Sequence, residues 1–358
     1  MVDLYVSATG SDSNPGSKSS PFKTIQEAAE HAKAGTTVHV APGTYLGGIH
    51  TETDGVTYVS DVKWAARIVP GSADNEHEAW NNLGDHVVID GFEVDGSQPQ
   101  GGMPWLYGVL TSGSGSAVRN VKVHDIARDS VAWSAANTGG QGGAGIMADG
   151  FNGDADITIS GSLVYDIGPN GEHSTLVHGI YIGTRGRVVN NTVHDVVGDG
   201  ISSWHDATDL TITCNAIRAV HGAGILIGAG NHLHGSGPND HSLVSNNTIT
   251  DSLKGIEENG DTGVNNTYRN NTLRGNGTDW SLQTGVRAAM AAEPDPGVAN
   301  LFGPPALLDP GLPQDGATLM AAPGVDLPGT PRSPLDTVSA LVEPPQPGYD
   351  LSGGFFMR

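Results

Sequence analysis

Residues 190–225 read NNTVHDVVGDGISSWHDATDLTITCNAIRAVHGAGI, and this stretch contains two copies of one pattern. In each copy an Asn lies two residues before a β-branched residue, Val193 or Ile217, and a Gly-Ile pair ends eight residues after that residue. Val193 and Ile217 lie 24 residues apart, as do Ile201 and Ile225. A repeat of this length, rich in Val, Ile, Thr, Asn and Gly, is typical of one three-sided coil of a β-solenoid. The stretch therefore predicts strands that stack on one another along one axis.

The pattern continues in both directions along the chain. Its last apolar residue recurs at separations of 29, 41, 29, 24, 32 and 24 residues, at Val94, Val123, Val164, Val193, Ile217, Ile249 and Leu273. The Gly-Ile pair recurs in the same register, with its isoleucine at Ile146, Ile180, Ile201, Ile225 and Ile256. A leucine-rich repeat has a similar period, but it needs Leu-dominated strands and helical outer segments. We therefore predict an all-β fold, a right-handed parallel β-helix in which longer separations are coils with inserted loops.

Asparagines mark one turn of the repeat. We expect a ladder of stacked side-chain amides at Asn120, Asn191, Asn215, Asn247 and Asn271. Asn tolerates left-handed backbone, and its amide can bond to equivalent residues in neighbouring coils. The repeat thus accounts for sequons such as Asn190-Asn191-Thr192 without glycosylation, and it makes Cys214 a small turn or core residue rather than a nucleophile.

The amino-acid composition argues against nucleic acid and membranes as binding partners. The 358 residues include 17 Lys and Arg against 39 Asp and Glu, a net charge of -22, which repels nucleic acid and anionic membrane surfaces. No apolar run reaches the roughly 18 residues that cross a bilayer. The opening MVDLYVSATG is typical of a mature domain whose export segment has been removed. We expect an extracellular, secreted monomer that binds neither nucleic acid nor membrane.

Three segments follow from these patterns. Residues 1–50 are predicted to cap the β-helix, because Thr24-Ile25-Gln26-Glu27 is a capping box and Gly35 is placed to end a short amphipathic helix. Such a helix would shield the open end of the first coil from water. Residues 51–285 are predicted to form the coils, and residues 286–358 an irregular C-terminal extension packed on them.

The N-terminal segment also carries a resemblance. Residues 5–45, YVSATGSDSNPGSKSSPFKTIQEAAEHAKAGTTVHVAPGTY, resemble the N-terminal cap of bacterial proteins of the pectate lyase-like superfamily. The resemblance implies a right-handed β-helix that acts on an acidic polysaccharide. The superfamily includes lyases, hydrolases, uronan epimerases and catalytically inert tail or adhesion modules. No lyase family's catalytic motif is intact in this sequence, so the resemblance extends to fold and substrate class alone.

Inserted loops point to one face of the coils. The chain lengthens just before the Gly-Ile strand in some coils and, at residues 231–241, just after it. Long loops in solenoids gather on the binding face, so the Gly-Ile strands should floor a groove. Because side chains alternate along a strand, the residue after each isoleucine should point outward. The densest group of polar and aromatic residues there comprises His178, Tyr181, Asp199, Ser202, Trp204 and His205.

These residues suggest roles in β-elimination, in which a base removes the proton beside a uronate carboxylate and a cation neutralises that carboxylate. His178 or Lys254 would be the base, Tyr181 the acid and Arg185 the carboxylate clamp. The expected catalytic residues are His178, Tyr181, Arg185, Asp199, His205 and Lys254. The expected substrate-binding residues are Ser202, Trp204, Asp206, His232, Glu257 and Asn259.

Three other functions stay open at this point. A glycoside hydrolase would pair Asp199 with Asp206 or Glu257, at the carboxylate spacing of about 5 to 9.5 Å that hydrolysis needs. An epimerase would use lyase-like groups on two sugar faces. A non-catalytic adhesin or phage fibre module needs only aromatic and hydrogen-bonding groups, whereas His178, Asp199 and His205 favour catalysis.

The sequence gives less support for a metal site than for the group of residues on the Gly-Ile strands. Ca²⁺ is the one cofactor left open, at the oxygen-rich patch formed by Glu257, Glu258, Asn259 and Asp261, although solvated turn acids explain that patch as well. A zinc site among His221, His232, His234 and His241 lacks a Glu or Cys ligand at a matching spacing. We assign no residue as a metal ligand.

Overall fold

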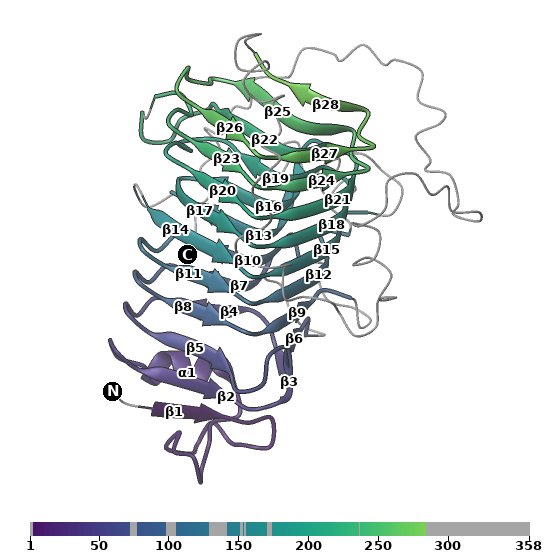
Figure 1. Cartoon of the computed structure of the whole chain (residues 1–358). Coiled ribbons are helices and arrows are strands. Elements are labelled where there is room, and N and C mark those ends of the chain that lie inside the picture. Colours follow the sequence, from purple (N-terminus) through teal and green to yellow (C-terminus); the bar gives the residue numbers. More distant parts are fainter. Residues whose placement is uncertain are drawn as a thin grey trace, which may run out of the picture. The chain divides into compact units, whose positions relative to one another are not determined.

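The computed structural model describes residues 3–71, 77–97, 105–128, 142–150, 153, 155–169, 174–235 and 237–283. The expected C-terminal extension, residues 286–358, lies outside the described residues. Parallel strands form three sheets, and each successive coil adds a strand to the first, the second and then the third sheet (Figure 1). The predicted right-handed parallel β-helix is therefore confirmed.

Strand bounds define the three sheets. Sheet 1 contains β1 (Asp3–Val6), β2 (Thr37–Val40), β5 (Thr57–Ser60), β8 (Val88–Asp90), β11 (Ala117–Arg119), β14 (Asp156–Ser160), β17 (Arg185–Val189), β20 (Thr211–Thr213), β23 (Leu243–Ser245) and β26 (Thr267–Arg269). Sheet 2 contains β3 (Gly43–Leu46), β6 (Ala66–Val69), β9 (Glu93–Asp95), β12 (Lys122–Ile126), β15 (Leu163–Ile167), β18 (Thr192–Val196), β21 (Ala216–Val220), β24 (Thr248–Thr250) and β27 (Thr272–Arg274). Sheet 3 contains β4 (Ile49–Thr51), β7 (Glu78–Asn82), β10 (Tyr107–Thr111), β13 (Gly143–Asp149), β16 (Val177–Gly183), β19 (Asp199–Ser203), β22 (Ala223–Ala229), β25 (Lys254–Gly260) and β28 (Thr278–Ser281).

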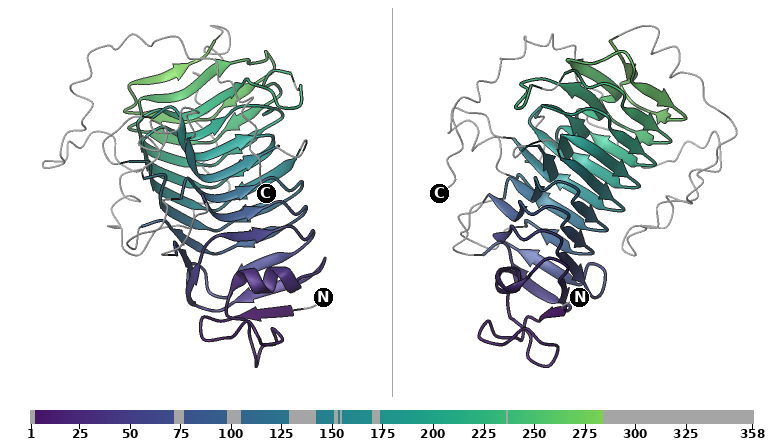
Figure 2. Two further views of the ribbon diagram at one scale, coloured as in Figure 1. Left: turned by 180° about the vertical axis from the view of Figure 1, so that it is seen from behind. Right: turned by 90° about the vertical axis from the view of Figure 1, so that its left-hand side faces the viewer.

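Strand register reproduces the repeat. Val193 pairs with Ile217 in sheet 2, and Ile201 pairs with Ile225 in sheet 3. Figure 2 shows the same stacking of strands from two further sides. The isoleucines of the five repeated Gly-Ile pairs have no exposed surface, namely Ile146, Ile180, Ile201, Ile225 and Ile256. One apolar column of the core is thus formed by residues that lie at equivalent places in successive coils, as the sequence predicts.

The asparagine ladder forms, with one correction. Asn191 donates its side-chain amide to Asn215 Oδ1 at 3.0 Å, and Asn215 does the same to Asn247 at 3.0 Å. Asn271 accepts the next bond from Asn247, also at 3.0 Å. The placement of Asn120 in this ladder is wrong. Asn120 has a φ of 54° and belongs one position earlier, with Cys214 at 59°, in a column of left-handed turn residues.

The predicted capping helix is α1 (Ile25–His31). Thr24 Oγ1 accepts a hydrogen bond from the Glu27 amide at 3.2 Å, as a capping box requires. The helix ends at His31 rather than near Gly35, because Ala32 already has an extended backbone, with ψ at 149°. Ile25, Ala28 and Ala29 are buried, and α1 contacts β4, β1 and β2. In the described part of the chain, no helix is long and apolar enough to cross a bilayer.

Candidate functional site

The outward face of sheet 3 carries the polar group that the sequence predicts. Register places His178 beside Asp199, and Tyr181 beside Ser202, on the adjacent strands β16 and β19. Their side chains are largely buried, with 9% of His178, 8% of Tyr181 and 8% of Asp199 exposed. Ser202 is 3% exposed. Neighbouring coils lie about 4.8 Å apart, so these residues are close enough to contact one sugar residue.

His178 and Asp199 form the centre of this group. The two atoms His178 Nδ1 and Asp199 Oδ2 are 3.4 Å apart. Among the described residues, Nδ1 has no hydrogen-bond partner of good geometry. The other oxygen of Asp199 accepts a hydrogen bond from the Ala223 amide at 2.8 Å. The carboxylate is therefore fixed by the next coil and faces the imidazole.

Tyr181 lies against both predicted histidines. Its ring centroid is 5.3 Å from that of His178 and 6.1 Å from that of His205. Burial raises the pKa of the Tyr181 hydroxyl well above its ordinary value of 10, and the charge of Asp149 raises it further. Tyr107 and Asp206 act in the same direction. The phenol therefore stays protonated and can donate a proton.

His205 and Asp206 are held by the loop after β22. His205 has a left-handed backbone with a φ of 52°, and its Nδ1 lies 3.2 Å from the Asn231 carbonyl. Asp206 Oδ2 accepts hydrogen bonds from the amides of Leu233 at 3.0 Å and His234 at 3.2 Å. His234 Nε2 lies 2.7 Å from the Gly150 carbonyl, 84 residues away in the chain. The loop is thus tied across several coils beside Tyr181.

Two further predicted residues lie at the same end of the strands. An added Cβ at Gly228 would lie 2.9 Å from the Trp204 ring, and one at Gly260 would lie 2.5 Å from it. The Trp204 indole therefore rests on glycine backbone of the next two coils and remains partly exposed. His232 lies between two carboxylates, 3.6 Å from Asp206 and 3.5 Å from Asp261.

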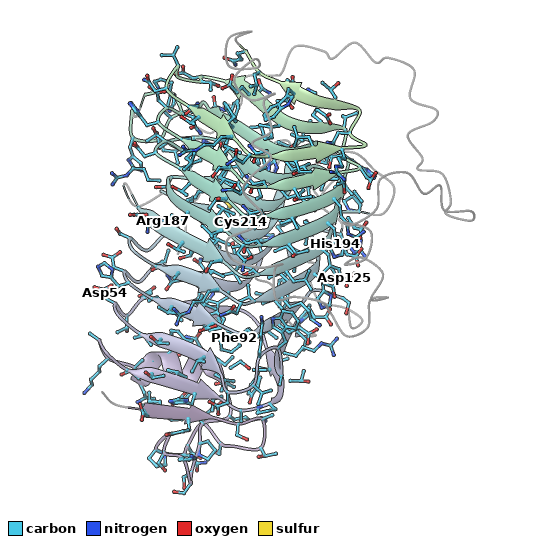
Figure 3. All side chains as sticks on the ribbon, viewed as in Figure 1. Asp54, Phe92, Asp125, Arg187, His194 and Cys214 are labelled. Carbon is cyan, nitrogen blue, oxygen red and sulfur yellow. The ribbon has the colours of Figure 1, made fainter. Side chains whose placement is uncertain are left out.

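Four expected site residues lie away from the His178 pair. Arg185 is exposed on β17 in sheet 1, where its register partner is Asp156. Figure 3 shows the neighbouring Arg187 on the side of the coils opposite His194. The strand order separates Lys254 on β25 from His178 on β16 by two intervening strands, and Lys254 Nζ is 2.7 Å from Glu257 Oε1. Asn259 Oδ1 accepts a hydrogen bond from the Gly260 amide at 2.7 Å.

The residues of the Ca²⁺ patch and of the histidine zinc site are not brought together in the structure. Glu257 and Glu258 point to opposite sides of β25, because Glu258 is 5% exposed and accepts a hydrogen bond from the Tyr268 hydroxyl at 2.7 Å. The oxygen-rich patch therefore does not converge on one point. His232 and His234 also have separate partners, and His241 is an exposed residue beside Asp240.

Sequence reasoning missed two residues of the sheet 3 group. Asp149 is 4% exposed and accepts a hydrogen bond from the Ser112 hydroxyl at 2.8 Å. Tyr107 occupies the column of His178, since both pair with Ala144. Burial, followed by the charges of Glu78 and Asp149, raises the Tyr107 pKa. The alternation of strand residues identifies Asp149 as outward-facing, but Tyr107 lies in a coil without a Gly-Ile pair.

Comparisons with known proteins match this architecture. A family described as "Protein of unknown function (DUF1565)" matches residues 8–52. The protein "Uncharacterized protein YwoF" of Bacillus subtilis (strain 168) is 53% identical over 55 residues, which are 14% of this chain and 12% of that protein. The chain thus matches a small fraction of that relative.

Two solved structures resemble the coils. The A-module of the mannuronan C-5 epimerase AlgE4 of Azotobacter vinelandii is 16% identical, with a TM-score of 0.53 over 72% of this chain and 67% of that one. The pectate lyase Pel9A is 15% identical, with a TM-score of 0.54 over 80% of this chain and 78% of that one. These similarities establish a pectate lyase-like parallel β-helix fold.

Proposed function

We propose that this protein is a polysaccharide lyase that cleaves an acidic, uronate-containing polysaccharide by β-elimination on the outward face of sheet 3. The observation that carries the proposal is the buried His178–Asp199 pair in ring contact with a protonated Tyr181. The proposal includes an extracellular location and action as a monomer. The names of the two similar structures, a pectate lyase and a uronan epimerase, support the substrate class.

Each residue has one role in the proposed step. Asp199, anchored by the Ala223 amide, orients His178 through Nδ1, so that Nε2 presents a lone pair to the substrate. Nε2 takes the proton from C5 of the uronate, and the C5–H electron pair forms the C4–C5 double bond. The C4–O4 bond breaks as Tyr181 gives its proton to O4. His178 then loses a proton to water and Tyr181 regains one.

The uronate carboxylate needs a positive charge beside it. Neither Arg185 nor Lys254 lies with the His178 pair. His205, whose ring also contacts Tyr181, is proposed to face this carboxylate, and Ca²⁺ is tested as an added cation because carboxylate oxygens are its preferred ligands. Trp204 and Ser202 are proposed to contact neighbouring sugar rings, with the partly exposed indole face stacking on one of them.

A glycoside hydrolase is the second candidate, and one observation favours it. The carboxylates of Asp149 and Asp206 both raise the pKa of the same Tyr181 hydroxyl, so both act electrostatically on one side chain of the site. Hydrolysis of a glycosidic bond uses two carboxyl groups placed across that bond.

The test is a panel of uronate polymers and neutral glycans, assayed with and without Ca²⁺ or a chelator. A lyase gives the ultraviolet absorbance of an unsaturated uronate together with new reducing ends. We expect His178→Gln to lower kcat by about 100-fold or more. The control His241→Gln, whose side chain is 65% exposed, should leave kcat unchanged. Reducing ends without absorbance would favour the hydrolase, and glycan binding without either product would identify a binding module. An active His178→Gln protein would refute the assignment.

A further inference from the structure

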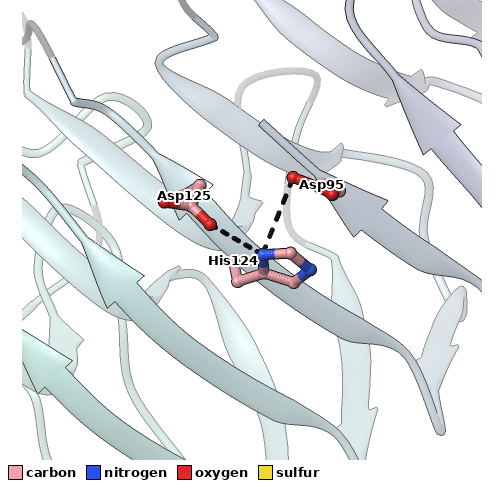
Figure 4. A group of neighbouring side chains, drawn as sticks. All are labelled: Asp95, His124 and Asp125. Atoms are coloured by element: carbon pink, nitrogen blue, oxygen red, sulfur yellow. Dashed lines mark hydrogen bonds and ion pairs between the residues drawn. The ribbon is translucent and has the colours of Figure 1, made fainter. Parts of the chain in front are cut away.

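A second cluster of ionisable side chains lies on the outward face of sheet 2. Register places Asp95 of β9 beside His124 of β12, and Asp125 follows with a left-handed φ of 57°. Figure 4 shows the two carboxylates facing the same edge of the imidazole. This cluster is separate from the His178 pair, which belongs to sheet 3.

The three ligand atoms have the spacing of a metal site. His124 Nδ1 is 2.9 Å from Asp125 Oδ2 and 3.7 Å from Asp95 Oδ1. All three atoms lie within 4.8 Å of one another. Metal–ligand bonds of about 2.0–2.2 Å place ligand atoms roughly 3–4 Å apart around one ion. A small adjustment therefore suffices for the three atoms to share a cation.

The surrounding residues hold each of these ligands in place. His124 Nε2 lies 3.2 Å from Glu93 Oε1, and Glu93 is paired with Lys122 at 2.7 Å. A carboxylate on the far ring nitrogen is the usual partner of a metal-binding histidine, because it leaves the lone pair on the other nitrogen. Here that nitrogen is Nδ1, which faces Asp95 and Asp125.

Each carboxylate ligand is fixed in the same way. Arg67 pairs with Asp95 Oδ2, and Asp95 Oδ1, which accepts a hydrogen bond from the Ser97 amide at 2.8 Å, lies toward the imidazole. Arg128 pairs with Asp125 Oδ1 at 2.7 Å, which leaves Oδ2 toward the imidazole. One oxygen of each carboxylate is thus held by an arginine while the other is directed to the common point.

Charge and burial are compatible with a cation at this point. Asp95 and Asp125 bring two carboxylates to this point, in a chain whose net charge is -22. The side chains of Asp95 and His124 are 3% and 10% exposed, whereas Asp125 is 23% exposed and leaves one side open to water. Mixed imidazole and carboxylate donors suit first-row divalent metals, whereas Ca²⁺ prefers oxygen alone.

We propose that Asp95, His124 and Asp125 bind a first-row divalent metal ion such as Zn²⁺, with water completing the coordination. The ion would join two successive coils, since β9 and β12 are adjacent strands. This inference is independent of the function proposed for sheet 3.

Calorimetric titration of Zn²⁺ into the chelator-treated full chain tests the proposal. We expect one ion per chain and a rise in the unfolding temperature. His124→Gln should weaken binding by at least about 100-fold. The matched control is His194→Gln, because His194 contacts Asp195 at 2.6 Å but its partner in the preceding coil is Tyr165 rather than an aspartate. This control should bind Zn²⁺ like the unmodified chain.

A second variant and a second ion guard against a folding defect. Asp125→Asn changes the most exposed ligand and should weaken Zn²⁺ binding while the far-ultraviolet circular dichroism spectrum stays unchanged. Co²⁺ bound by the unmodified chain should show visible absorption bands that Zn²⁺ removes. Stoichiometric binding that survives both His124→Gln and Asp125→Asn would overturn the proposal, as would no binding of either ion at millimolar concentration.

Discussion

Replacing Asn215 by Ala removes the central member of the asparagine ladder. The Asn215 side chain accepts hydrogen bonds from the backbone and side-chain amides of Asn191, at 2.9 and 3.0 Å. It donates to the Val188 carbonyl at 2.9 Å and to Asn247 Oδ1 at 3.0 Å. Asn215 itself is 2% exposed, so water does not replace these bonds freely.

The expected cost follows from the groups that lose their partner. The Asn191 N–H and the Val188 carbonyl would each lose a hydrogen bond in the interior, at about 1–3 kcal/mol per buried group. The broken side-chain bonds add to this, so we expect the free energy of unfolding to fall by about 4 kcal/mol. Such a loss is a large part of the 5–15 kcal/mol that is typical of folded domains, roughly a quarter or more.

Urea unfolding followed by circular dichroism measures this change. Cys214→Ala is the control, because Cys214 occupies the adjacent turn position and its sulfur contacts the Thr213 hydroxyl at 3.6 Å. It should cost under about 1 kcal/mol. Hydrogen exchange should also speed up at the Asn191 amide in Asn215→Ala. If Asn215→Ala and Cys214→Ala destabilise the protein equally, the ladder does not carry the stability that we assign to it.

Two further predictions concern backbone strain and alkaline pH. Gly186→Ala should lower the free energy of unfolding by more than about 2 kcal/mol, whereas Gly237→Ala should be nearly neutral. Gly186 has a φ of +152° and an added Cβ 2.1 Å from the Ile157 carbonyl oxygen, while Gly237 has open space; equal unfolding midpoints would contradict this. Because burial raises the pKa of Tyr58 and Tyr181, stability should begin to fall above about pH 10, where the unfolded chain ionises first. Tyrosinate absorbance checks this, and full ionisation in the folded protein near pH 10 would refute it.

The fold is predictable from the sequence because successive coils repeat the same pattern of apolar residues at the same spacing. The spacing of Ile201 and Ile225 identifies both the inward side of the strand and the length of one coil, and the register agrees. Asn120 fails because RNVKV places its asparagine one residue further from the aligned valine than NNTV does. An error of one residue moves a side chain from the ladder to the neighbouring turn column.

The candidate site was only partly predictable. Alternation within a strand correctly brings Tyr181 and Ser202 together, since neighbouring strands share one register. The alternation of side chains along a strand does not show where the chain leaves one sheet for the next. The sequence therefore groups Arg185 with the sheet 3 residues, whereas it lies on β17 in sheet 1. The cluster of Asp95, His124 and Asp125 on sheet 2 could have been found from the sequence. Once Val94 and Val123 are aligned, Asp95 and His124 occupy the same position in successive coils.

The contacts on the two faces differ in a way that separates their proposed roles. On sheet 2, the carboxylates of Glu93, Asp95 and Asp125 each pair with a Lys or Arg side chain. On sheet 3, among the described residues, His178 Nδ1 is buried without a well-aligned hydrogen-bond partner. The sheet 2 carboxylates are thus held in place by ionic contacts, which suits ligands of a structural metal ion, whereas His178 belongs to the proposed catalytic group on sheet 3.

This difference makes the two sites separable by experiment. His124→Gln should lower the unfolding temperature of the metal-loaded protein but leave kcat per folded molecule unchanged. His178→Gln should lower kcat by about 100-fold or more but leave the response of the unfolding temperature to Zn²⁺ intact. If a chelator removes activity from the unmodified chain and His124→Gln is equally inactive while folded, the sheet 2 cluster serves the chemistry and our separation of the two faces is wrong.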